Sequence, residues 1–162
     1  MSERERAIQE CIDKMAIMET LARYSNCVDS GDAAGFAAVF TEDAIWQWEG
    51  IGLSYTGRNQ LHNLAEGIAR HLPGAQHMVS NAIITIQNDH AHCVSQVTTF
   101  LSRPESIYTV LQGFYEDTLR KLGDAWLISH RRVRVANPEI ISQGKIGEYY
   151  RPLVKFLSQV TH

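Results

Sequence analysis

The feature that most constrains the fold is a long stretch, residues 76–135, in which apolar and polar side chains alternate. A period of two is typical of strands that bury one face. Turn-forming pairs interrupt the alternation at Asn88-Asp89 and Gly123-Asp124, and Pro104 breaks it once more. We therefore expect four long strands in hairpin succession, over residues 77–86, 91–101, 107–122 and 126–135.

The residues before this stretch follow a helical period instead. Apolar side chains recur at three- and four-residue intervals from Ile8 to Val28, which predicts a long first helix. Gly31 can take the left-handed conformation that ends a helix, and Asp32 can cap a short helix over residues 33–40. The other elements expected in this half are a strand, a glycine-bearing bend and a helix, over residues 44–48, 49–52 and 58–70.

The C-terminal segment from Glu139 to Val160 carries an apolar stripe at helical spacing and predicts a final helix, which Pro152 would break. Helices first and a long antiparallel sheet second indicate an α+β fold, in which a curved sheet wraps around the helices. Such a wrap leaves a cavity at its open end. With 162 residues and no repeats or linkers, the chain is predicted to be one domain over residues 1–162.

Charge and composition exclude several classes of function. The net charge is -3 and the basic residues are scattered, so we expect no nucleic-acid partner. No stretch is long and apolar enough to span a bilayer, and the N-terminus has no apolar signal core, so we expect a cytoplasmic protein without a membrane partner. The three cysteines lack metal or redox spacing and are interpreted as buried apolar side chains: Cys11, Cys27 and Cys93. A small hydrophobic molecule is the partner that fits best.

Two polar residues are candidates for chemistry. Asp29 lies in the last turn of the first predicted helix, where the helix dipole disfavours a negative charge by about 0.3–1 kcal/mol. His77 opens the first long strand. A histidine with one ring nitrogen held by a carboxylate is fixed in tautomer and acts as a base near neutral pH. Spacing does not show whether the two pair, so a solvated carboxylate and a core histidine are the alternatives.

Tyr24 and Arg131 are further candidates. Tyr24 lies about 140° around the helix from Asp29, so it either flanks the same cavity or packs in the apolar stripe of the helix. In the last strand, alternation puts Arg131 on one face. Its charged neighbours lie on the opposite face: His130, Arg132 and Arg134. An inward Arg131 would need an anionic partner or substrate.

Aromatic residues are predicted either to line a hydrophobic pocket or to fill the core, the pocket candidates being Trp48, Tyr55, Phe100 and Phe114. His90 and His92 share one face of a strand, but they adjoin a turn and have no evident third ligand. We therefore expect a solvated turn there, and no metal site.

Taken together, these segments resemble the SnoaL-like branch of the NTF2-like superfamily over nearly the full length of the chain, most clearly at residues 24–29, 36–44, 76–81 and 123–126. The resemblance implies an α+β cone, with N-terminal helices packed in the concave face of a strongly curved, mostly antiparallel sheet. Within this branch the chain is similar to hexachlorocyclohexane dehydrochlorinase. That likeness implies that Asp29 and His77 form a catalytic dyad and that Arg131 lies in the active site.

Tyr24 departs from the dehydrochlorinase, which carries a lysine there, and is similar to the tyrosine of the bile acid 7α-dehydratases. Scytalone dehydratase is a more distant likeness. The resemblance implies elimination without a cofactor, so we predict a dehydratase acting on a hydrophobic cyclic substrate. His77 would be the base, Asp29 would orient it, Tyr24 would hydrogen-bond a substrate oxygen, and Arg131 would stabilise negative charge.

Several alternatives to this prediction stay open. They are an isomerase or polyketide-cyclase-type enzyme, a dehydrochlorinase, a non-catalytic ligand-binding module, and the small subunit of a ring-hydroxylating dioxygenase. An exposed face of the predicted sheet suggests self-association. The resemblance implies a homo-oligomer, a trimer or a dimer.

Overall fold

The computed structural model describes residues 2–136, 155–156 and 159. Within these residues the helices are α1 (Glu3–Ser30), α2 (Ala33–Ala38) and α3 (Gly57–His71), and a short 3-10 helix spans Glu49–Ile51. The strands are β1 (Phe40–Trp48), β2 (Leu53–Thr56), β3 (Ala75–Gln87), β4 (His90–Arg103), β5 (Ser106–Leu122) and β6 (Ala125–Val135).

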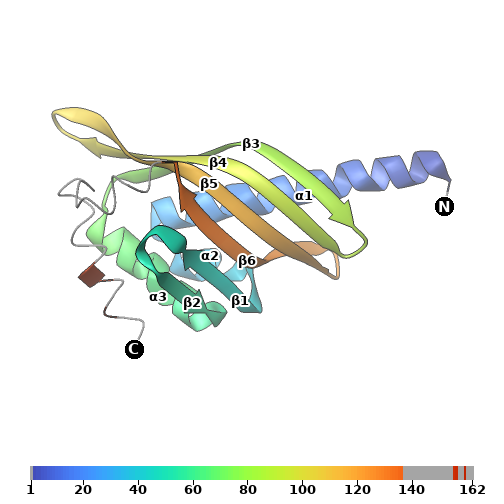
Figure 1. Cartoon of the computed structure of the whole chain (residues 1–162), viewed down its shortest axis with the longest axis horizontal. Coiled ribbons are helices and arrows are strands. Elements are labelled where there is room, and N and C mark those ends of the chain that lie inside the picture. The colour runs from blue at the N-terminus through green and yellow to red at the C-terminus, as the bar shows by residue number, and fades with distance from the viewer. Residues whose placement is uncertain (1, 137–154, 157–158, 160–162) are drawn as a thin grey trace.

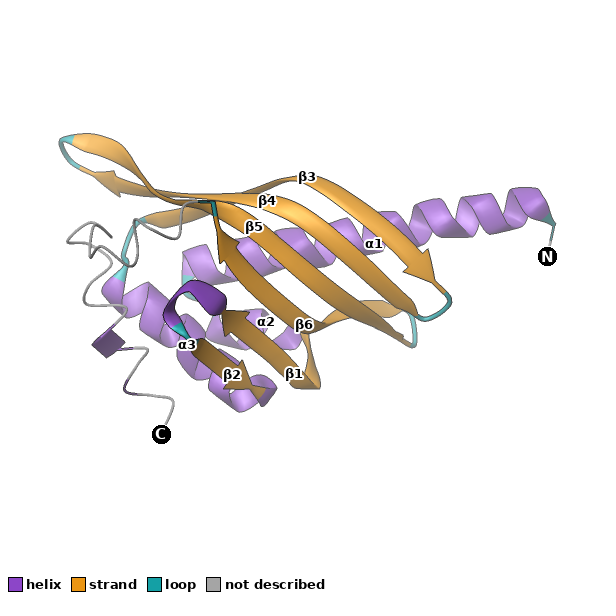
Figure 2. Ribbon diagram, in the orientation of Figure 1, coloured by secondary structure: helices purple, strands orange, loops and turns teal. Residues whose placement is uncertain are grey.

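The six strands form one curved sheet in the order β2-β1-β6-β5-β4-β3, and the helices lie against one of its faces (Figure 1). Strands β3 to β6 pair antiparallel in hairpin succession, as the alternation predicted. β1 pairs parallel to β6 and antiparallel to β2, so β1 and β2 extend the sheet beyond β6 (Figure 2). The α+β cone of the NTF2-like fold is therefore confirmed.

Local sequence signals explain where the first two helices begin and end. Ser2 and Glu5 form a capping box at the start of α1, and Gly31 ends α1 with a φ of 76° in the left-handed region. The Asp32 side chain accepts a hydrogen bond from the backbone N–H of Gly35 over 2.9 Å and so caps α2. These signals confirm the predicted break between the two helices.

Polar contacts fasten α1 across the sheet. The Asp13 carboxylate accepts hydrogen bonds from Lys121 Nζ at 2.7 Å and from the Trp126 indole at 2.9 Å. About two turns further along, the Thr20 hydroxyl donates to the Trp126 carbonyl over 2.7 Å. These contacts hold the middle of α1 against the end of the sheet where β5 meets β6, so the second half of the helix runs under the concave face.

The structure corrects parts of the prediction. The sequence missed β2, which follows the predicted bend at residues 49–52, and β1 begins four residues before the predicted Ala44. Cys93 is buried, but Cys11 is exposed and Cys27 is half-buried, so the interpretation of three buried cysteines was wrong. The reason is that Cys11 lies on the first turns of α1, which extend past the sheet. The predicted helix from Glu139 to Val160 falls largely outside the described residues.

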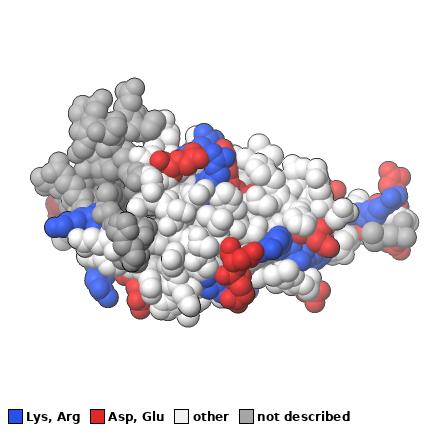
Figure 3. All heavy atoms as spheres, turned by 60° about the horizontal axis from the view of Figure 1, so that its bottom comes forward, with Lys and Arg blue, Asp and Glu red and all other residues white. Residues whose placement is uncertain are grey.

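Acidic and basic side chains are interspersed on the face shown in Figure 3, without a basic stripe. Several charged side chains form ion pairs, including Arg132 with Glu49 and with Glu116, and Arg58 with Glu42. In the described part of the chain, no helix has the length and apolar character needed to cross a bilayer.

Candidate active site

The end of α1 and the start of β3 bring Asp29 and His77 into contact. One carboxylate oxygen of Asp29 lies 2.6 Å from His77 Nδ1, and the other accepts a 2.8 Å hydrogen bond from the backbone N–H of His77. The Asp29 side chain is 21% exposed and the His77 side chain is 11% exposed. The two hydrogen bonds compensate the unfavourable position of Asp29 at the negative end of the helix dipole.

This contact assigns the tautomer of His77. A carboxylate without a proton can only accept hydrogen bonds, so Nδ1 carries the hydrogen and donates it to Asp29. Nε2 then has a free lone pair and is the ring nitrogen able to take a proton. An imidazole held in this way has a fixed orientation, which is what a general base requires.

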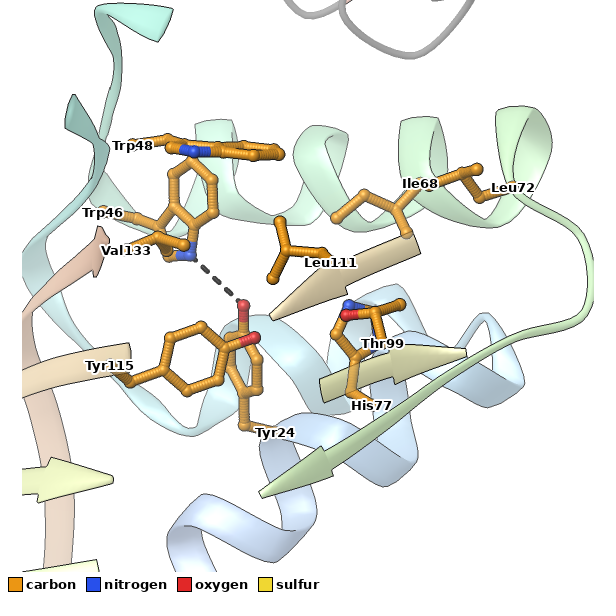
Figure 4. Close-up of a pocket in the computed structure, with 10 residues that line it drawn as sticks. All are labelled: Tyr24, Trp46, Trp48, Ile68, Leu72, His77, Thr99, Leu111, Tyr115 and Val133. Carbon is orange, nitrogen blue, oxygen red and sulfur yellow. Dashed lines mark hydrogen bonds between the residues drawn. The ribbon is translucent and has the colours of Figure 1, made fainter. Parts of the chain in front are cut away.

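His77 lines a cavity between the sheet, α1 and α3 (Figure 4). The cavity measures about 30 Å³, space for one or two water molecules. A ligand with a carbon ring therefore requires side chains at its edge to move. Four of the residues that line it offer a hydroxyl or imidazole group: Tyr24, His77, Thr99 and Tyr115. The other six are mainly apolar: Trp46, Trp48, Ile68, Leu72, Leu111 and Val133.

Tyr24 reaches the cavity from α1 (Figure 4). Its ring is 2% exposed and packs at 4.8 Å, centroid to centroid, from Phe36 of α2. The hydroxyl oxygen accepts a hydrogen bond of 3.2 Å from the indole nitrogen of Trp46. The structure thus places Tyr24 both in the packed core and at the cavity, two positions that the sequence presented as alternatives.

Arg131 faces inward as predicted, but it does not line the cavity. It is fully buried and forms two hydrogen bonds of 2.7 Å to the carboxylate of Asp117, on the neighbouring strand β5. Burial alone would lower the pKa of Arg131, but the charge of Asp117 and the hydrogen bonds to it, together with Tyr24 and Tyr115, outweigh burial and raise that pKa above its usual range. The guanidinium stacks between two rings, 3.9 Å from the centroid of Tyr24 and 4.1 Å from that of Tyr115.

Sequence reasoning missed Thr99, a polar residue of the cavity, and left Tyr115 between pocket and core, as it did the other aromatic residues. Thr99 is directly opposite His77 in the register of β3 and β4, is fully buried, and its hydroxyl has no hydrogen-bond partner among the described residues. Tyr115 lies on β5, beside Val133 of β6. The sequence did not identify the inward face at these points, because it predicted their strand neighbours Phe100 and Phe114 for the pocket. Only the packing of α1 and α3 shows which positions meet the cavity.

The four aromatic residues predicted for the pocket divide between different places. Trp48 lines the cavity. Tyr55 of β2 lies behind it, packed edge to face against Trp46, and burial raises the pKa of Tyr55 to about 12. Phe100 and Phe114 are half-buried on the other face of the sheet, and Arg134 lies over the ring of Phe114. These three side chains are therefore outside this cavity.

Within the residues that the structure describes, no cluster of three or more His, Cys, Asp or Glu side chains is placed to hold a metal ion. His90 and His92 both lie exposed on β4, next to the turn into that strand.

Comparison with known families gives one match that covers most of the chain. The sequence profile of the SnoaL-like domain family matches residues 9–132, which include α1, the complete sheet as far as Arg132, and all the cavity residues except Val133. No curated protein matches the chain significantly.

Solved structures share the fold at low sequence identity. An NTF2-like protein with a cystatin-like fold from Novosphingobium aromaticivorans is 23% identical, with a TM-score of 0.76 over 87% of this chain and 91% of that chain. A putative scytalone dehydratase from the same organism is 24% identical, with a TM-score of 0.71 over 81% and 89%. LinA is 18% identical, with a TM-score of 0.72 over 81% and 90%. At these identities the likeness concerns the fold.

Proposed function

The chain belongs to the SnoaL-like domain family, and from that premise we propose that it is a lyase that removes water from a hydrophobic cyclic hydroxy-ketone. The observation that carries the proposal is the contact between Asp29 and His77 at the edge of a mostly apolar cavity. The resemblance to dehydratases and to a dehydrochlorinase supports elimination as the reaction type. The fold alone does not, because this architecture hosts many activities.

In the proposed reaction, His77 Nε2 takes a proton from the carbon next to the substrate carbonyl. Asp29 stabilises the imidazolium that forms, since its carboxylate stays hydrogen-bonded to Nδ1. The electron pair of the broken C–H bond forms a carbon–carbon double bond, and the bond to the neighbouring hydroxyl breaks. The departing hydroxide takes the proton from the imidazolium and leaves as water, which restores neutral His77.

Two hydroxyls support the oxygen atoms in this scheme. Tyr24 lies at the cavity with its own proton available, so we assign it to the carbonyl oxygen. Thr99 is adjacent to His77 and is unpartnered among the described residues, so we assign it to the departing hydroxyl. Arg131 acts from behind the tyrosine rings and has no direct contact with the substrate in this scheme.

The test is a panel of cyclic hydroxy-ketones incubated with the protein and analysed by mass spectrometry for loss of one water. His77→Ala and Asp29→Asn are each expected to reduce the rate by about 100-fold or more, because a general base contributes about 10²–10⁴-fold. His92→Ala, a change on the exposed face of β4, is the matched control and is expected to retain the wild-type rate. Equal rates for wild type and His77→Ala would exclude His77 as the base.

An isomerase or cyclase is the second candidate, because the same base and hydroxyl donor can move a double bond or close a ring. Mass separates the two, since an isomerised product keeps the mass of its substrate. A purely ligand-binding role is less well supported, because binding alone does not require a histidine held in one tautomer by a carboxylate. A dioxygenase small subunit would be indicated by co-purification with an iron–sulfur partner.

We also propose that the chain forms a homo-oligomer, a dimer or a trimer. The support is the amount of apolar side chain on the outer face of the sheet, where Met78 and Ile83 of β3 are 60% and 72% exposed. Exposed apolar residues that share one face commonly mark an interface.

A further inference from the structure

The hydroxyl of Tyr24 is held by a hydrogen-bond donor. The indole N–H of Trp46 donates to the Tyr24 oxygen over 3.2 Å, along the wall of the cavity (Figure 4). The two side chains are 4% and 2% exposed, so water does not compete for this bond. Within the described part of the chain the Tyr24 hydroxyl only accepts. Its own proton is therefore available to an oxygen atom of a ligand in the cavity.

A positive charge lies behind the same ring. The guanidinium of Arg131 stacks on the face of Tyr24 at 3.9 Å and on that of Tyr115 at 4.1 Å, and Asp117 fixes its position through two hydrogen bonds. A cation on the face of an aromatic ring attracts its π electrons. Negative charge that develops at the hydroxyl end of the ring is thereby stabilised, although the cation itself does not reach the ligand.

The remaining walls strengthen these effects. Trp48, Leu111 and Val133 present apolar surface to the cavity, between Tyr24 and the start of α3 (Figure 4). Hydrogen bonds and charges act more strongly in such surroundings than in water. The combination of a free hydroxyl proton, an N–H on the same oxygen and a cation behind the ring favours a ligand oxygen that is negatively charged.

We propose that Tyr24 forms a binding site for an anionic ligand oxygen, and that Trp46 is the positioning residue that orients and polarises its hydroxyl. This inference rests on the proposed function and narrows its substrate class. The substrate is a carbonyl compound whose oxygen becomes an enolate when His77 removes the neighbouring proton. The electron pair of the broken C–H bond forms a double bond to the carbonyl carbon, and the π pair of the C=O bond moves onto the oxygen, which hydrogen-bonds to Tyr24. When that pair returns to the C=O bond, the enolate double bond shifts to the neighbouring carbon and expels the hydroxide.

The experiment uses 4-nitrophenol, whose neutral and ionised forms differ in visible absorbance. It is bound to the full chain in a His77→Gln background, because an imidazolium would attract the anion by itself. The ionised fraction of bound probe is compared with that of free probe at the same pH. Since a ring needs more room than the present cavity offers, the titration is repeated with Leu111→Ala, which enlarges the cavity.

The bound probe is expected to be more ionised than the free probe. Trp46→Phe, which keeps an aromatic ring but removes the N–H, is expected to reduce this preference by about tenfold, the usual effect of one hydrogen bond to a charged group. Trp48→Phe is the matched control, because it takes the same volume from the same cavity and leaves the Trp46–Tyr24 bond intact. It is expected to retain the preference.

Three results would overturn the inference: a bound probe that is neutral, an ionised fraction that Trp46→Phe leaves unchanged, or no binding in either the native or the enlarged cavity. Failure of the proposed function has a different signature. If no hydroxy-ketone loses water but the probe still ionises with the expected dependence on Trp46, the anionic oxygen site stands and the lyase assignment falls.

Discussion

At the scale of single residues, Thr99 shows how a site differs from a core. A buried hydroxyl without a partner costs a folded protein about 1–3 kcal/mol, yet the chain has this group beside His77. Ser95, four residues earlier on the same strand, is also buried with an unpartnered hydroxyl within the described structure. Only Thr99 of these two lines the cavity, so a ligand can satisfy Thr99 and not Ser95.

Thr99→Val is therefore expected to change stability and activity in opposite directions. Valine has nearly the same shape, so the variant should be as stable as wild type or more stable by about 1 kcal/mol, while the elimination rate falls. Thermal unfolding and kcat/KM measure the two effects. Thr98→Val, the neighbouring change on the other face of β4, is the control for β-branched packing. A loss of stability with unchanged activity would contradict the role given to Thr99.

The ion pair between Arg131 and Asp117 is the other feature at this scale. Both side chains are fully buried, and removing one charge leaves the other without compensation. Asp117→Asn is expected to lower the free energy of unfolding by about 3–5 kcal/mol, and the double variant Arg131→Met with Asp117→Leu by less than that single change. Urea denaturation of the single and the double variant measures both losses. A double variant that loses as much stability as Asp117→Asn, or more, would contradict the expectation.

At the scale of elements, α1 is the part that positions the site. Its N-terminal turns extend past the sheet, its middle is fastened by Asp13, and its end carries both Tyr24 and Asp29. Burial opposes ionisation of Asp13, but the hydrogen bonds from Lys121 and Trp126 outweigh burial and lower its pKa below 3.8. The folded state therefore binds the Asp13 proton less tightly than the unfolded state does.

This difference predicts the pH dependence of stability. Ionised Asp13 contributes fully to the free energy of unfolding above its pKa in the unfolded chain, near 3.8. This contribution is lost as the pH falls through the lower pKa of the folded state. Asp13→Asn should thus be less stable than wild type at pH 7, and the gap should close below about pH 4. Urea unfolding of both proteins between pH 3 and pH 7 measures this difference in stability. Glu10→Gln, which removes the exposed ion pair with Lys14, is the control. A gap that is constant with pH would contradict the assignment.

At the scale of the whole molecule, the helices α1 to α3 cover one face of the sheet, and no described helix covers the other (Figure 2). Strand β3 is at the edge of the sheet, and its outward residues include Ile83. An edge strand with exposed apolar side chains is prone to pair with another chain. Self-association through this face would cover Ile83 and the half-buried Phe100 and Phe114.

Analytical ultracentrifugation is expected to show a dimer or trimer of the wild type, and Ile83→Glu is expected to shift it toward monomer. Met15→Glu is the matched control, because Met15 has the same 72% exposure but lies on α1. Dissociation by Met15→Glu alone would place the interface on α1 instead of on the sheet. A monomeric wild type would refute the proposed assembly.

Much of this architecture follows from local sequence patterns. Alternating side chains at residues 76–135 predicted four antiparallel strands, and Gly31 with Asp32 predicted the break between α1 and α2. β2 was missed because it has only four residues, Leu53–Thr56, and its strand character comes from pairing with β1. The extension of β1 to Phe40 likewise depends on its parallel pairing with β6.

The sequence by itself determined most of the elements and the candidates Tyr24, Asp29, His77 and Arg131, because these depend on periods and caps within one segment. The tertiary structure decided which candidates meet. Asp29 and His77 are 48 positions apart, and only the packing of α1 on β3 joins them. The register of β5 and β6 places Arg131 beside Asp117, the anion that a buried cation needs, and the packing of α1 on the sheet places Tyr24 over its guanidinium.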